Sequence, residues 1–224
     1  MAESKPYDLP MEKLTAVLTG DFVGSTEADP DRLERSMVVL AYQAALIGSD
    51  TRFTRFRGDG WQIYLAKPSL FLWVTVYLNA VLKSDPFGSL PSRIAIGTGR
   101  VDRLGPIGLS AASGTAFFHS GRALDAMDRN GQTIALAGEG TDDIQRIAIA
   151  FIEERIAKWS PEQAEAVRLR MNRKEFTTQG KMAADFGITR QAVAARLQAA
   201  GYSLIDAAIG AFHSRYYEYE VTDV

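Results

Sequence analysis

The stretch TQGKMAADFGITRQAVAARLQAAG, residues 178–201, constrains the fold more than any other part of the chain. Residues 179–185 are predicted to form one short helix, and Thr189 is the expected N-cap of a second helix that ends near Ala200. Gly187 lies between them, where a tight turn requires a residue that tolerates a left-handed backbone. The apolar residues fall on the sides of the two helices that must face each other: Met182, Phe186, Ile188, Val193 and Leu197. The pattern predicts a helix-turn-helix of DNA-binding type, with a helical hairpin used only for packing or dimerisation as the alternative.

The second predicted helix would expose side chains of the types that contact base edges or phosphates in the major groove. Residues 168–196 contain seven basic side chains and two acidic ones, although the formal net charge of the chain is −2. Such a local excess of positive charge favours a phosphate backbone as the partner, and a solvated helix face is the alternative. The predicted DNA-binding residues are Lys174, Thr189, Arg190, Gln191 and Arg196.

The rest of the chain alternates strand patterns with helical patterns. Apolar, β-rich runs predict strands at residues 13–19, 52–57, 61–65, 93–101 and 133–137. Helical spacing predicts helices from residue 30, over 68–82, over 115–127 and from about residue 141. This order favours a ferredoxin-like α+β sheet with its helices on one face. Ser160 and Pro161 form a good helix start, after which the chain is predicted to be all-α, so we expect two domains, 1–150 and 151–224.

Composition limits the chemistry that the chain can support. It has no cysteine and two histidines, which excludes disulfides, thiolate metal sites and a histidine-rich zinc site. A bound metal ion would be held mainly by carboxylates and carbonyl groups, which favours Mg²⁺ or Mn²⁺. The polar N-terminus lacks the apolar run of a signal peptide, and the apolar stretch 68–82 is shorter than the roughly 20 residues that span a bilayer. We therefore expect a cytoplasmic protein that is not bound to a membrane.

Two aspartates lie where predicted strands end or turn. Asp21 follows the first predicted strand, and Asp59 lies in the predicted hairpin within residues 52–65. Pairing of these strands would bring both carboxylates close enough to hold one or two hard cations. The short run 22–26 follows Asp21 and precedes a helix, where backbone amides can bind phosphates. For Gly58-Asp59-Gly60, a tight hairpin turn without a ligand is the alternative.

Residues 13–137 resemble the catalytic domain of class III nucleotide cyclases, through Asp21 with its following loop, Asp59 in the hairpin, and RIAIGTG at residues 93–99. The resemblance implies metal binding by Asp21, Phe22 and Asp59. It implies nucleotide binding by Val23, Gly24, Ser25, Thr26 and Arg55, where Arg55 takes the position of a base-reading lysine. Arg122 matches the arginine that one subunit presents to the transition state in its partner. The asparagine expected four positions earlier is replaced by Phe118.

Over its whole length the chain resembles the SatD family. The matching segments are residues 20–25, 58–62, 96–99, 114–124 and 178–197. This resemblance implies a cyclase-like domain fused to a C-terminal helix-turn-helix, and it implies no particular activity. Gly60 and Trp61 replace the usual Glu-Phe of the hairpin, so a third acidic ligand is absent.

Three functions are compatible with these features. The first is a DNA-binding regulator, a homodimer whose cyclase-like domain binds a metal–nucleotide ligand and controls the helix-turn-helix. The alternative is an active nucleotide cyclase or related nucleotidyltransferase that uses two metal ions on a nucleoside triphosphate. The third is a dimerisation module without a ligand. The missing asparagine disfavours turnover, and the aspartate pair beside the loop disfavours the ligand-free module.

Overall fold

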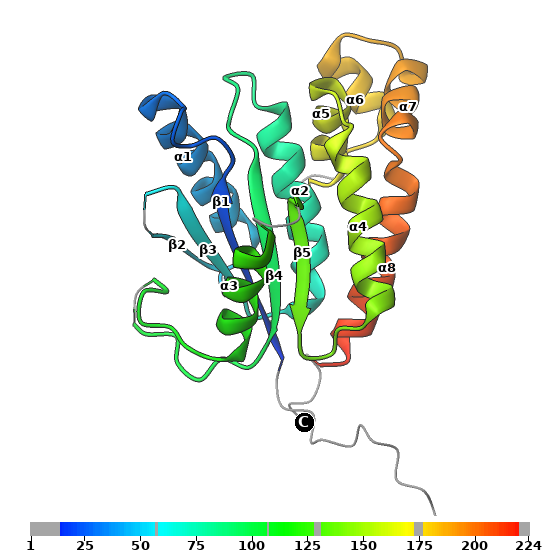
Figure 1. Cartoon of the computed structure of the whole chain (residues 1–224). Helices are drawn as coiled ribbons and strands as arrows, with labels where there is room; N and C mark the ends of the chain where they lie inside the picture. The colour runs from blue at the N-terminus through cyan, green and yellow to red at the C-terminus, as the bar shows by residue number, and fades with distance from the viewer. Residues whose placement is uncertain (1–13, 57, 107, 128–130, 173–176, 220–224) are drawn as a thin grey trace, which may run out of the picture.

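The computed structural model describes residues 14–56, 58–106, 108–127, 131–172 and 177–219. It is a mixed α+β structure, in which a five-stranded sheet is followed by a group of helices (Figure 1). The strands are β1 (Thr15–Phe22), β2 (Arg52–Phe56), β3 (Gly60–Leu65), β4 (Ser92–Gly99) and β5 (Ile134–Gly138). The helices are α1 (Pro30–Ile47), η1 (Pro68–Leu70), α2 (Phe71–Ser84), α3 (Thr115–Met127), α4 (Asp143–Ala157), α5 (Pro161–Arg170), α6 (Gln179–Phe186), α7 (Arg190–Ala199) and α8 (Tyr202–Tyr217). The predicted α+β class is confirmed.

The strands lie in the order β2-β3-β1-β4-β5. Neighbours among the first four strands are antiparallel, and β5 is parallel to β4. With α1 and α2 as the two connections, the first four strands form the βαββαβ arrangement of ferredoxin-like sheets, extended at one edge by β5. The register places Asp21 opposite Arg93 and Thr19 opposite both Gln62 and Ala95. Residues from three strands therefore meet at the centre of the sheet.

Helices cover both faces of this sheet, so the prediction of helices on one face was wrong. Ala16 and Leu18 of β1 belong to the large core that also contains residues of α1, α2 and α4. Val17 points to the opposite face, where it packs with Tyr64 and with residues of α3. Because β1 is apolar on both sides, both faces must be buried. Gly97 allows the close approach of α3, since a Cβ there would lie 2.3 Å from the carbonyl oxygen of Ala116.

One hydrophobic core continues from the sheet into the C-terminal helices. Helix α4 spans residue 150, where the sequence predicts a boundary between two domains. Helix α5 packs on α2, and α8 packs on η1. The ring of Phe71 makes edge contacts with Phe212 and Tyr216 of α8, at centroid distances of 5.7 and 5.0 Å. Trp159 is buried and donates through Nε1 to the carbonyl oxygen of Ala200 at 2.8 Å. Removal of the C-terminal helices would therefore expose a large part of this core. Among the described residues, no helix combines the length and apolarity that a bilayer crossing needs.

Tyr216 gives this shared core a specific pH dependence. Its hydroxyl donates to the carbonyl oxygen of Gly140 at 3.1 Å and lies 3.4 Å from the side-chain nitrogen of Gln145. Burial of the Tyr216 phenol raises its pKa from 10.0 to about 12. The pKa of Tyr216 is higher in the folded state than in the unfolded state. The stability that the protonated phenol contributes to the fold is therefore complete below pH 10 and is lost as the pH rises through about 12.

The Tyr216→Phe variant is therefore expected to lose less stability than the wild type when the pH is raised above 10. At neutral pH the variant should lose about 1 kcal/mol of unfolding free energy, the value of a typical hydrogen bond. Between pH 10 and 12 the wild type should lose about 2–3 kcal/mol more than the variant. Urea unfolding at a series of pH values measures both quantities. Parallel pH profiles for the two proteins would contradict the assignment.

Candidate functional site

Asp21, at the end of β1, is bound by an arginine from the neighbouring strand. Arg93 of β4 lies directly opposite in the register and donates from Nε to Asp21 Oδ1 at 2.8 Å and from a terminal nitrogen to Oδ2 at 2.5 Å. The two side chains are 23% and 22% exposed. The hydrogen bond from Arg93 to Asp21 raises the pKa of the guanidinium. Both oxygens of the Asp21 carboxylate are thus occupied by a bidentate ion pair.

Asp59 lies in the hairpin turn between β2 and β3, and it is tied to the loop that follows β1. The hydroxyl of Ser25 donates to one oxygen of Asp59. The charge of Asp59 also contributes to the raised pKa of Arg93. The structure therefore places Asp21, Ser25 and Asp59 in one region, and it adds Arg93, which is bound to Asp21 and interacts with the charge of Asp59. No local sequence pattern points to Arg93, because its partner Asp21 is far away in the chain.

The loop after Asp21 offers backbone donors to a ligand. Gly24 has a φ of 71°, and the amide of Val23 donates to the carbonyl oxygen of Pro91 at 2.8 Å. Within the described residues, the amides of Gly24, Ser25 and Thr26 make no hydrogen bond. Gly24 and Thr26 are exposed, and Ser25 is half-buried. Three consecutive amides without a partner among the described residues, in the loop that follows the Arg93-bound Asp21, can bind the oxygens of a phosphate.

A divalent metal ion does not fit these residues as they stand. Both oxygens of Asp21 already accept from Arg93, and Asp59 accepts from Ser25. Within the described parts of the chain, no group of three or more acidic or histidine side chains could hold a metal ion. The side chain of Phe22 is buried in the core under the sheet. The positive charge of Arg93 lies on Asp21, where a cation would bind, so the predicted Mg²⁺ or Mn²⁺ site is not preformed.

The two other arginines predicted for this site make contacts of their own. Arg55 of β2 pairs with Glu34 of α1 at 2.5 Å and donates from Nε to the carbonyl oxygen of Gly58 at 2.7 Å. It therefore lies beside the turn that carries Asp59. Arg122 is exposed on α3 and lies over the ring of Phe118, with its guanidinium carbon 5.5 Å from the ring centroid. Neither Arg55 nor Arg122 is hydrogen-bonded to Asp21.

A buried polar network connects the site to α3. The hydroxyl groups of Thr19 and Ser120 lie 2.8 Å apart, and Gln62 donates to Thr19 at 3.2 Å. Thr19 is two residues before Asp21 on the same face of β1, because side chains alternate along a strand. This network fixes α3 against the strands that carry the site. No local sequence signal identifies it, since its three members come from distant parts of the chain.

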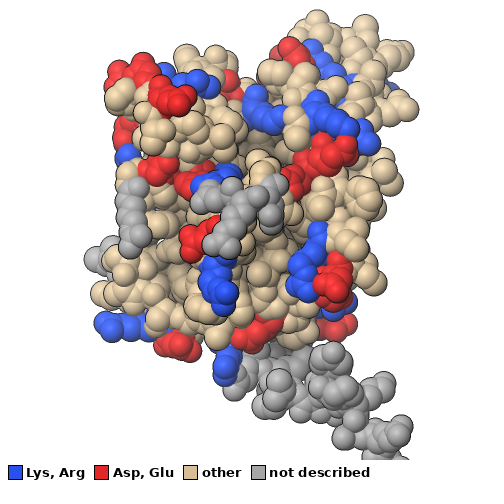
Figure 2. All heavy atoms as spheres, viewed as in Figure 1, with Lys and Arg blue, Asp and Glu red and all other residues tan. Residues whose placement is uncertain are grey.

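Helices α6 and α7 form the second candidate site. Gly187 ends α6 with a φ of 64°, and the hydroxyl of Thr189 accepts from the amide of Ala192 at the start of α7. Val193 and Leu197 are buried, whereas three residues at the start of the helix are exposed: Thr189, Arg190 and Gln191. Figure 2 shows that Lys and Arg side chains gather at the upper right of the molecule, over α5 and α6. Lys174 lies outside the described residues.

Arg196 contacts the protein itself. Its guanidinium carbon lies 5.2 Å from the centre of the Phe186 ring, and a terminal nitrogen lies 3.8 Å from a carboxylate oxygen of Glu165. Its side chain is 27% exposed. Arg196 therefore helps to hold α7 against α5 and α6, and it presents less of its surface to a ligand than Arg190 does.

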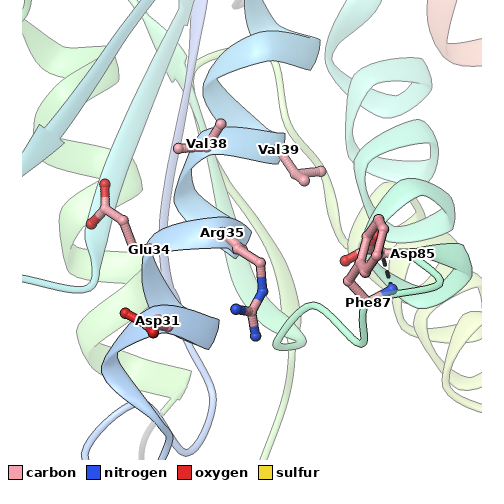
Figure 3. A pocket seen from close by; sticks show the side chains of 7 residues that line it. All are labelled: Asp31, Glu34, Arg35, Val38, Val39, Asp85 and Phe87. Carbon is pink, nitrogen blue, oxygen red and sulfur yellow. Dashed lines mark hydrogen bonds between the residues drawn. The ribbon is translucent and has the colours of Figure 1, made fainter.

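A groove of about 420 Å³ lies apart from both sites, between α1 and the segment that follows α2 (Figure 3). Its lining residues are Asp31, Glu34, Arg35, Val38, Val39, Asp85 and Phe87. The side chain of Arg35 points into the space between α1 and this segment (Figure 3). Two of its acidic groups have partners: Glu34 pairs with Arg55, and Asp85 accepts from Ser89. None of the residues at the Asp21 site lines this groove.

No family model matches this chain, and no curated protein matches it either. The resemblance to the SatD family therefore stays a sequence prediction. Among solved structures, a bacterial light-regulated adenylyl cyclase is similar at 17% identity and a TM-score of 0.45, over 55% of this chain and 42% of that chain. The GGEEF domain of a diguanylate cyclase from Vibrio cholerae is similar at 13% identity and a TM-score of 0.42, over 58% and 85% of the two chains. The guanylyl cyclase Cya2 is similar at 17% identity and a TM-score of 0.37, over 50% and 70%. The matched region spans less than half of the first of these proteins.

Proposed function

We propose that this protein is a DNA-binding regulator that binds the phosphates of a nucleotide at the end of β1 and binds DNA through α7. The observation that carries the proposal is the distribution of side chains on α7. Its inner face is fixed by the buried Val193 and Leu197, and its exposed first turn carries Arg190 and Gln191. Arginine and glutamine are the side chains that bind guanine and adenine edges in the major groove.

The local geometry of α6 and α7 supports this role. The left-handed Gly187 and the capping Thr189 make a short, well-defined turn, so α7 is presented at a fixed angle to α6. In helix-turn-helix proteins the N-terminal residues of the second helix contact the bases. Basic residues in the last turn of α5, Arg168 and Arg170, add positive charge nearby. A DNA duplex is therefore the partner that fits this surface best.

Nucleotide binding is supported by the combination of a cation and free amides. Arg93 lies beside the loop in which Gly24, Ser25 and Thr26 have unbonded amides within the described part of the chain. Phosphate oxygens accept well from arginine and from such backbone donors. A phosphate would compete with Asp21 for Arg93, so occupancy of the site and the Asp21–Arg93 ion pair are coupled.

Binding without turnover is favoured over the nucleotidyltransferase alternative. Asp21 is occupied by Arg93, and Phe118 stands where the resemblance to cyclases requires an asparagine. Arg122 contacts Phe118 on the exposed side of α3. The proposed homodimer could still bring Arg122 of one subunit to the site of the other, and measurement of cyclic product from each nucleoside triphosphate tests that alternative.

A structural route joins the two proposed sites. Strands β1 and β4, which carry Asp21 and Arg93, pack on α2. Helix α2 in turn packs on α5, and α5 packs on α7. These elements form one continuous core, and we infer that the proposed regulation acts through it.

Two measurements on the full chain test the proposal. Fluorescence anisotropy with random-sequence duplex DNA should show binding that weakens steeply as the salt concentration rises, because counterions are released from the phosphates. A thermal-shift screen of the four nucleoside triphosphates, with and without Mg²⁺ or Mn²⁺, should show a higher melting temperature with at least one of them. Absence of DNA binding at low salt would contradict the DNA-binding role. Absence of any shift would contradict nucleotide binding.

A further inference from the structure

The end of β1 that carries Asp21 is held by a buried tryptophan and a buried serine. Trp61 of β3 is fully buried, and Ser92 of β4 is 3% exposed. The indole Nε1 of Trp61 donates to the hydroxyl oxygen of Ser92 at 3.0 Å. The single proton of this hydroxyl is donated to the main-chain carbonyl oxygen of Asp21 at 2.6 Å, the shorter of its two carbonyl contacts. One hydrogen-bonded chain therefore links the neighbouring strands β3, β1 and β4 beside the site.

The indole ring also fixes the main chain of β1. Trp61 lies opposite Gly20 in the register of β1 and β3. A Cβ at Gly20 would lie 2.4 Å from the ring carbon Cζ2 of Trp61 and 2.4 Å from the carbonyl oxygen of Arg93. The ring therefore occupies the space that a side chain at position 20 would fill, and it lies against the residue that precedes Asp21. This close approach requires glycine at position 20.

Ser92 and the residue before it attach the loop that follows β1 to the start of β4. The hydroxyl of Ser92 binds the carbonyl oxygen of Asp21, and the carbonyl oxygen of Pro91 accepts from the amide of Val23 at 2.8 Å. The next amides along the chain, those of residues 24–26, are the ones without a partner among the described residues. The main chain is thus held up to the residue at which the proposed phosphate donors begin.

We infer that Ser92, held by Trp61, is a positioning residue for the Asp21–Arg93 ion pair and for the amides of the following loop. Ser92 lies opposite Phe22 in the register, and both Phe22 and Trp61 belong to the large core. Side chains alternate along a strand, so Asp21 and Arg93 point to the other face of the sheet. Ser92 and Trp61 therefore act on the site through the main chain. The inference rests on the proposed nucleotide binding only where a ligand is measured.

The two buried groups depend on each other for their hydrogen bonds. A buried indole N–H needs an acceptor, and the hydroxyl of Ser92 supplies it to Trp61. Ser92→Ala would leave this N–H unpaired and would also release the carbonyl oxygen of Asp21. Addition of Trp61→Phe removes the unpaired donor, so the double variant should regain part of the lost stability. The carbonyl of Asp21 stays released in the double variant, which separates positioning of the site from stability of the fold.

Hydrogen exchange of the Arg93 side chain tests the inference on the full chain without a ligand. In the wild type the Nε–H of Arg93 donates to Asp21 Oδ1 at 2.8 Å, so its NMR signal should exchange slowly with water. Loss of the signal in Arg93→Lys identifies it. Exchange should be at least about 10-fold faster in Ser92→Ala, and it should stay fast in the double variant with Trp61→Phe although urea unfolding shows that stability is partly regained.

Thr98→Val is the matched control, because Thr98 is a fully buried residue at the other end of β4. Its hydroxyl donates to the carbonyl oxygen of Glu139 at 2.7 Å. This variant should lose stability as Ser92→Ala does, while Arg93 exchanges as slowly as in the wild type. Slow exchange in Ser92→Ala, or exchange that follows unfolding stability across all of these variants, would overturn the inference. If Ser92→Ala alone does not fold, exchange in the double variant decides.

Calorimetric titration with ATP, GTP, CTP and UTP measures the effect on the loop. Any of these that binds the wild type should bind Ser92→Ala and the double variant at least about 10-fold more weakly, and Thr98→Val with unchanged affinity. Wild-type affinity in Ser92→Ala would show that Ser92 does not position the loop. If none of the four binds the wild type, the proposed nucleotide binding is wrong, and the exchange of Arg93 still decides whether Ser92 positions the ion pair.

Discussion

Replacement of Arg190 and Gln191 together by alanine is expected to weaken DNA binding at least about 30-fold. Each side chain that contacts a base contributes about 1–3 kcal/mol, and the two lie next to each other on the exposed first turn of α7. The fold should be unaffected, because neither residue contributes to the buried side of the helix. Fluorescence anisotropy at fixed salt, with a DNA site selected from a random pool, measures the loss.

The single variants separate two kinds of contact. Arg190→Ala and Gln191→Ala should each relax the preference for the selected site over random DNA, whereas loss of a contact to phosphate alone would weaken binding to both DNAs and lower the salt slope by about one. Arg35→Ala is the matched control for the lost charge, since Arg35 is exposed on α1 in a different region of the molecule. Unchanged affinity of the double variant would show that α7 does not contact DNA.

Point variants are the right tool because the C-terminal helices cannot simply be removed. Trp159 is buried, α5 packs on α2, and Phe71 contacts two aromatic residues of α8. A truncation after Trp159 would expose these surfaces, and the loss of DNA binding would then reflect unfolding. The prediction of two domains from the sequence does not imply that either part folds alone.

The second large effect is expected at the β1 end. Arg93→Ala should abolish the thermal shift caused by the nucleoside triphosphate that stabilises the wild type, because it removes the cation that is bound to Asp21 and that also interacts with the charge of Asp59. Asp21→Asn should instead keep nucleotide binding, since Arg93 is then released to the phosphate. If Asp21 held a metal ion that binds the nucleotide, Asp21→Asn would abolish binding as well, and this result would contradict the role given to Arg93.

The change in stability caused by Asp21→Asn is expected to have the opposite sign from the change that two unpaired carboxylates would give. Repulsion between Asp21 and Asp59 would make the variant more stable than the wild type. The bidentate pair with Arg93 makes Asp21 favourable, so the variant should lose about 1–2 kcal/mol of unfolding free energy. Glu154→Gln is the control: it breaks the exposed Glu154–Lys158 pair and should change stability less than Asp21→Asn does. Urea unfolding measures all three proteins.

The sequence by itself determined the local elements of this protein. The five strands and the helices between them follow from periodicity and turn residues that act within a few positions. The same holds for the turn at Gly187 and the caps at Thr189 and Ser160, whose partners lie within four residues. These signals place Asp21 and Asp59 at the ends of strands, and they place Arg190 and Gln191 at the start of a helix. All such features depend on interactions between neighbours in the chain.

Only the tertiary structure decided what those residues face. Arg93 reaches Asp21 because β1 and β4 pair in one particular register, and the two residues are far apart in the sequence. Helix α3 covers the second face of the sheet because β1 is apolar on both sides, a pattern that does not specify which helix packs where. Arg196 lies over Phe186 because α6 and α7 meet at a particular angle. The pairing of strands and the packing of helices depend on the whole set of core contacts, which no local pattern of residues specifies.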